Sequence, residues 1–123
     1  MLRKVAGAVA GVIMWTVIVV ALDFALRNVW HDYAAVEKAM AFTVPMMAAR
    51  LAMSGAGSLA GGAVAASVGR DRFASALIAG VILLVLFLPI HYTIWPKFPI
   101  WYHLTFLTSL PVLSVVGGRF TRA

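Results

Sequence analysis

The chain has 123 residues, of which 63% are hydrophobic and only 11% are charged, and its formal net charge is +6. Soluble domains carry charge on about a quarter of their residues, so this composition excludes a soluble globular protein and predicts an integral membrane protein. Scattered rather than clustered basic residues argue against nucleic-acid binding, and the lack of cysteine excludes disulfides, thiol catalysis and thiolate metal sites.

The length allows about four membrane spans of ~20 residues with short connections. We therefore predict an all-α integral membrane protein, a single domain over residues 1–123, with four transmembrane helices in an antiparallel bundle. The predicted spans cover about 5–26, 47–69, 73–91 and 100–118, and a short amphipathic helix at about 33–44 is expected on the outer surface.

The first span follows the basic segment MLRK, which also suits a signal peptide. The apolar run from Val5 is long, however, and no small-x-small cleavage site with polar sequence follows it, so we expect a retained helix. Trp30 and Tyr33 are typical of the headgroup boundary, and the segment after them has apolar residues at helical spacing. Pro45 predicts a kink or break before the second span.

The second span is apolar, yet nearly all of its side chains are small, a pattern typical of helices that approach each other closely. It is therefore expected in the middle of the bundle, packed within one subunit; the alternative is an oligomer contact or a channel wall. The predicted helix-packing residues lie in the first and second spans: Gly7, Gly11, Ser54, Gly57, Ser58, Gly61 and Gly62.

The last two spans are separated by a dense aromatic belt, in which Pro96 and Pro99 preclude a continuous helix. The belt consists of Tyr92, Trp95, Trp101 and Tyr102. Orientation follows from the basic residues beside the spans: six lie on the side of both termini and three on the other. Since cytoplasmic loops are enriched in Lys and Arg, both termini are predicted to be cytoplasmic, and short loops suggest a bacterial inner membrane. The two sets are Arg3, Lys4, Arg70, Arg72, Arg119 and Arg122, and Arg27, Lys38 and Lys97.

Four ionisable side chains are predicted at one depth in the outer part of the membrane. Asp23, Arg50, His91 and His103 each lie 15 to 18 residues from the inner end of their span. An unpaired charge in hydrocarbon is costly, so we predict that Asp23 and Arg50 form an ion pair with a histidine nearby. The alternative is that Arg50 extends to the headgroups without a partner.

The three histidines, His31, His91 and His103, are weak candidates for a metal or haem site, because each lies at the outer end of a different span. They lack the spacing of a known metal motif, and interfacial histidines commonly contact headgroups, so we expect no cofactor and no metal. In size alone the chain is comparable to the small multidrug resistance transporters, but where their first span has an essential glutamate this chain has Met14, Trp15 and Thr16.

Three functional hypotheses follow. The first is a non-enzymatic accessory or assembly subunit that packs through its second span, with the lipid bilayer and a partner membrane protein or a second copy as its contacts. The second is an oligomeric transporter or channel that uses the layer of Asp23, Arg50, His91 and His103. The third is a haem- or metal-binding electron-transfer subunit.

Overall fold

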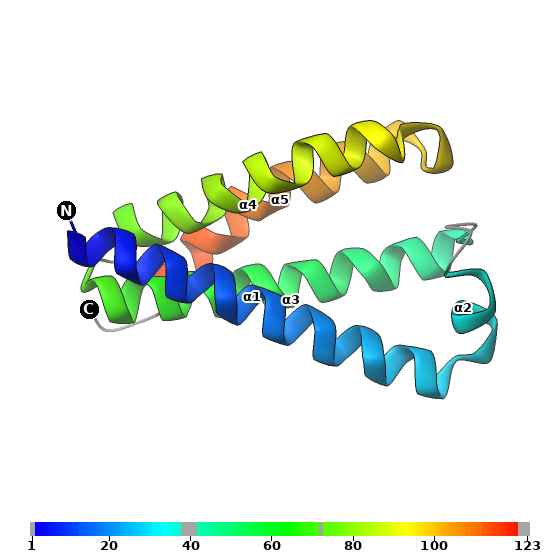
Figure 1. The fold of residues 1–123 in the computed structure, drawn as a ribbon, viewed down its shortest axis with the longest axis horizontal. Coiled ribbons are helices and arrows are strands. Elements are labelled where there is room, and N and C mark those ends of the chain that lie inside the picture. The colour runs from blue at the N-terminus through cyan, green and yellow to red at the C-terminus, as the bar shows by residue number, and fades with distance from the viewer. Residues whose placement is uncertain (1, 38–41, 72, 121–123) are drawn as a thin grey trace.

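The computed structural model describes residues 2–37, 42–71 and 73–120, and within these ranges it contains helices and no strand (Figure 1). Four of the helices are long and apolar enough to cross a membrane, which confirms the all-helical class and the predicted number of span-length helices among the described residues. In chain order the helices are α1 (Leu2–Val29), α2 (His31–Val36), α3 (Val44–Gly69), α4 (Ala74–Thr93), the 3-10 helix η1 (Trp95–Lys97) and α5 (Ile100–Arg119).

The segment between the first two long helices differs from the sequence prediction of an amphipathic helix at 33–44. Helix α2 ends at Val36, Val44 already belongs to α3, and residues 38–41 lie outside the described part of the chain. Pro45 lies in the first turn of α3, where no backbone N–H is needed, so it begins the helix instead of kinking it. The hydroxyl of Thr43 caps this helix by accepting a hydrogen bond from the N–H of Met46 at 3.5 Å.

The long helices form two pairs, α1 with α3 and α4 with α5, which are joined mainly by contacts between α3 and α5 (Figure 1). The start of α1, the connection from α3 to α4 and the end of α5 lie toward one end of the molecule. The helices α2 and η1 lie at the other end, where the two pairs diverge. We refer to the latter as the α2 end.

Helix α3 packs against α1, α4 and α5 through its small residues. A Cβ atom added to Gly61 would lie 2.7 Å from the carbonyl oxygen of Gly11, and one added to Gly11 would lie 2.5 Å from the carbonyl oxygen of Gly61. On the side toward α5, Gly62 lies directly against the backbone of Ser114. These contacts leave no room for a larger side chain, so Gly61 and Gly62 serve packing within this chain.

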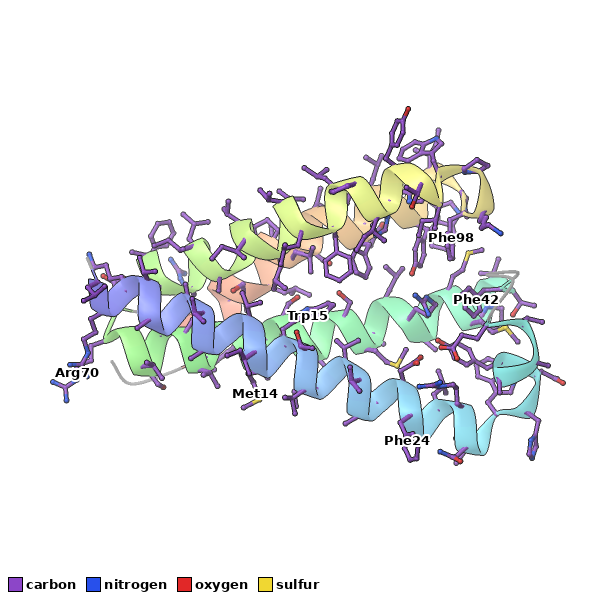
Figure 2. All side chains as sticks on the ribbon, in the orientation of Figure 1. Met14, Trp15, Phe24, Phe42, Arg70 and Phe98 are labelled. Atoms are coloured by element: carbon purple, nitrogen blue, oxygen red, sulfur yellow. The ribbon has the colours of Figure 1, made fainter. Side chains whose placement is uncertain are left out.

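The connection between α3 and α4 is held by Asp71. Its Oδ1 atom accepts hydrogen bonds from the backbone N–H groups of Phe73 at 2.9 Å and Ala74 at 2.6 Å, and its Oδ2 lies 3.6 Å from Nζ of Lys4 in α1. The hydrogen bond from the backbone N–H of Ala74 contributes most to lowering the pKa of Asp71. Just before it, Arg70 ends α3 in the left-handed region at φ 54°, and its side chain projects from this end of the molecule (Figure 2).

Candidate functional site

Arg50 is the centre of a polar network at the α2 end. Its Nη1 donates a hydrogen bond to the hydroxyl of Tyr33 at 2.9 Å, and its Nε donates to the hydroxyl of Tyr102 at 3.1 Å. The guanidinium carbon also lies 4.7 Å from the centroid of the Phe42 ring, within the range of a cation–π contact. Arg50 therefore has partners on α2 and α5, as well as the chain just before α3, and does not lie alone among headgroups.

Asp23 reaches this network through Tyr33. The Tyr33 hydroxyl donates to Oδ1 of Asp23 at 2.7 Å, while Oδ2 of Asp23 lies 3.3 Å from Nε of Arg27. The same Nε lies 3.3 Å from Oε1 of Glu37. The described residues contain no ion pair within 4.0 Å between Asp23 and Arg50, so the predicted direct contact is replaced by a tyrosine hydroxyl that bridges the two charges.

Tyr33 of α2 and Glu37, the residue after α2, have shifted pKa values. Burial raises the pKa of Tyr33 well above its usual range, and the hydrogen bond to Asp23 raises it further. The phenol is therefore neutral at physiological pH and donates its proton to Asp23 while it accepts from Arg50. Burial also raises the pKa of Glu37, with the neighbouring carboxylate of Asp23 acting in the same direction.

The two histidines of α4 and α5 form a pair. Nδ1 of His91 lies 2.7 Å from Nδ1 of His103, and Nε2 of His103 lies 3.1 Å from the carbonyl oxygen of Trp95. Because a carbonyl oxygen only accepts, His103 carries its proton on Nε2; in a neutral ring its Nδ1 then accepts, and His91 donates from Nδ1. The contacts of this pair tie α4, η1 and α5 together.

Stacked rings enclose these polar groups at the α2 end. Trp95 stacks on His103 with 4.3 Å between centroids, and Phe98 stacks on Tyr102 at the same distance. The ring centroids of Phe42, just before α3, and Phe98, just before α5, are 5.8 Å apart, so rings beside the two helix pairs meet (Figure 2). This contact bridges the divergence of the pairs seen in the ribbon.

A cavity of about 330 Å³ lies between α1, α3, α4 and α5 beside the network. Four charged side chains line it, together with apolar and aromatic side chains; Trp15 projects from α1 toward the interior (Figure 2). Ser54 of α3 also lines the cavity, and its buried Oγ atom has no hydrogen-bond partner among the described residues. The charged residues are Asp23, Arg27, Glu37 and Arg50, and the main apolar ones are Trp15, Val19, Met53, Phe87 and Phe106.

The structure connects the predicted polar layer, although not in the predicted way. His91 and His103 contact each other, and Tyr102, which binds Arg50, stacks on His91 with 6.1 Å between centroids. His31 is exposed at the start of α2, and the described residues contain no group of three or more His, Asp or Glu placed to hold a metal ion.

The sequence analysis placed the two tyrosines that bind Arg50, Tyr33 and Tyr102, at the headgroup boundary and in the aromatic belt, yet they are only 0% and 1% exposed. One signal could have identified them: a guanidinium in the membrane needs several hydrogen-bond acceptors, and tyrosine supplies one at the interface.

Comparisons of the chain with protein-family models, with curated proteins and with solved structures found no match.

Proposed function

We propose that this chain is a small multi-pass protein of a bacterial inner membrane that acts as a non-enzymatic accessory or assembly subunit. In this proposal α1, α3, α4 and α5 cross the bilayer as an antiparallel bundle, with both termini and the connection at residues 69–73 in the cytoplasm. The bias of Lys and Arg toward that side supports the orientation. The position of these segments toward one end of the molecule is compatible with it.

The observation that carries the proposal is how the polar groups at the α2 end are used. Arg50 and Asp23 are each bonded to side chains from other helices or from elsewhere in the chain, and the histidines are bonded to each other. Such bonds join helices to one another. A rigid body of this kind suits a subunit that stabilises a partner.

Gly61 and Gly62 of α3 pack against other helices of this chain, so we look for the partner contact on another helix. Exposed apolar side chains lie on α1, α4 and α5, and they suit lipid or the helix of a partner equally in chemistry. On α1 these side chains form a stripe that repeats every three to four residues and is at least 41% exposed throughout: Val5, Val9, Ile13, Val17, Val20 and Phe24. We propose that α1 provides the contact with a partner or a second copy.

Two experiments test these proposals. Reporter fusions after Arg70 and after Ala123 should be active only as cytoplasmic reporters, and a periplasmic signal would contradict the orientation. A photocrosslinking residue at Val17, compared with one at exposed Val112 on α5, should join the chain to one membrane protein in native membranes. Deletion of the chain should then lower the abundance of the complex that contains this protein.

The cavity favours transport as a second candidate function, since charged groups inside the membrane often mark ion or substrate paths. Proteoliposomes that hold the purified chain alone decide between the two. Saturable flux of an ion or proton that Asp23→Asn abolishes without unfolding the protein would support transport and contradict an accessory role. Absence of flux across ions of both signs would leave the accessory role as the better explanation.

A further inference from the structure

We propose that the cavity beside Arg50 binds the headgroup of a zwitterionic phospholipid that carries a primary ammonium group, such as phosphatidylethanolamine. The inference rests on the membrane placement proposed above and is independent of the accessory role. Three features of the cavity carry it: a separation of charge in its lining, an unpaired hydrogen-bonding atom within it, and its mixture of charged and apolar walls.

The first feature is the positive charge of Arg50. Its hydrogen-bond partners among the described residues are the hydroxyls of two tyrosines. No carboxylate lies within 4.0 Å of its guanidinium in that part of the chain, which includes all four acidic side chains. Guanidinium groups have five N–H donors and match phosphate oxygens geometrically. Arg50 thus has donors left for an anion in the cavity that it lines.

The complementary negative charge lies on the same cavity. Arg27 contacts both Asp23 and Glu37 at 3.3 Å, so two carboxylates share one guanidinium. When both carboxylates are ionised, this group has an excess of one negative charge. All three side chains line the cavity together with Arg50. A ligand with a phosphate and a nearby ammonium would neutralise both charges, whereas a purely anionic headgroup would neutralise one and be repelled by the other.

The second feature is Ser54, whose side-chain oxygen is buried without a partner although the residue is only 1% exposed. A buried hydroxyl left unpaired costs free energy, so its position on the wall of the cavity indicates a polar group of the occupant. The third feature is the apolar part of the lining, in which Trp15, Phe87 and Phe106 offer rings to the glycerol and first methylenes of a chain. A cavity of about 330 Å³ takes a headgroup and not a whole lipid.

Thermal unfolding of the purified full-length chain in detergent, titrated with short-chain phospholipids, tests the proposal without assuming any orientation or partner. Phosphatidylethanolamine should raise the midpoint temperature of unfolding saturably. Phosphatidylglycerol and phosphatidylcholine should bind at least roughly tenfold more weakly, because each loses about one charge-assisted hydrogen bond. Equal stabilisation by all three lipids would overturn the site. Equal stabilisation by glycerophosphoethanolamine, which has no chains, would show a soluble zwitterion as the ligand and overturn the lipid.

Matched variants locate the binding. Glu37→Gln should abolish the preference for phosphatidylethanolamine over phosphatidylglycerol, and Asp32→Asn, an exposed acid on neighbouring α2 that does not line the cavity, should keep it. If Glu37→Gln does not fold, Val20→Phe decides instead: Val20 lines the cavity but is 59% exposed, so a larger ring should obstruct the ligand and leave the fold intact. Its control is Val17→Phe, one turn earlier on α1 and outside the cavity. Unchanged lipid preference in both Glu37→Gln and Val20→Phe would place the lipid elsewhere.

Discussion

Replacing Tyr33 with phenylalanine removes one oxygen atom and tests whether this hydroxyl holds the α2 end together. The ring would stay, because its stacking on Phe42 at 5.1 Å does not involve the hydroxyl. Two hydrogen bonds would be lost, one given to Asp23 at 2.7 Å and one received from Arg50 at 2.9 Å. Tyr33 is 0% exposed, so water cannot readily replace the missing oxygen.

The expected cost follows from these two bonds. A hydrogen bond to a charged group contributes about 1.5–3 kcal/mol in soluble proteins, while interhelical bonds in membranes average about 0.6 kcal/mol. Since each bond here has a charged partner and a buried hydroxyl, we expect Tyr33→Phe to lower the free energy of unfolding by about 2–3 kcal/mol. Tyr102→Phe removes one hydrogen bond, the one received from Arg50, and should cost about half as much.

Reversible unfolding in mixed detergent and SDS micelles, followed by circular dichroism, measures these differences. The matched control is Tyr92→Phe, because Tyr92 is 83% exposed and its change should cost less than about 0.5 kcal/mol. In a double-mutant cycle, Tyr33→Phe should be less harmful in an Arg50→Gln background, with a coupling energy of about 1 kcal/mol. Equal stability of Tyr33→Phe and Tyr92→Phe would refute the bridging role.

Two further predictions concern the packing of α3 and the connection after it. Gly61→Ala should lower stability by about 1–3 kcal/mol, because the new Cβ would lie 2.7 Å from the backbone oxygen of Gly11, whereas Gly55→Ala meets only the end of the Leu113 side chain at 3.3 Å; equal unfolding free energies would contradict this. Asp71 has a lowered pKa, so its stabilising effect should be complete above about pH 4 and vanish as the pH falls through its folded-state pKa. Unfolding from pH 7 to pH 2 should show the stability difference between wild type and Asp71→Ala shrinking toward acid, and a constant difference would refute it.

The helices of this protein could be predicted from the sequence because their signals are local. An apolar run of span length predicts a membrane helix whatever surrounds it, and four such helices are present among the described residues. The glycine spacing around Gly57 and Gly61 also indicated close approach, since small side chains are needed wherever backbones meet. Counting residues from the helix ends also predicted that Asp23 and Arg50 share one depth, and in the structure both side chains bond to the hydroxyl of Tyr33.

Only the tertiary structure decided how that region is connected. Counting residues gives the depth of a side chain, but not the direction in which it points around its helix, and that direction depends on how the helices pack. Tyr33 and Tyr102 therefore read as headgroup residues in the sequence, although packing turns both hydroxyls inward to Arg50.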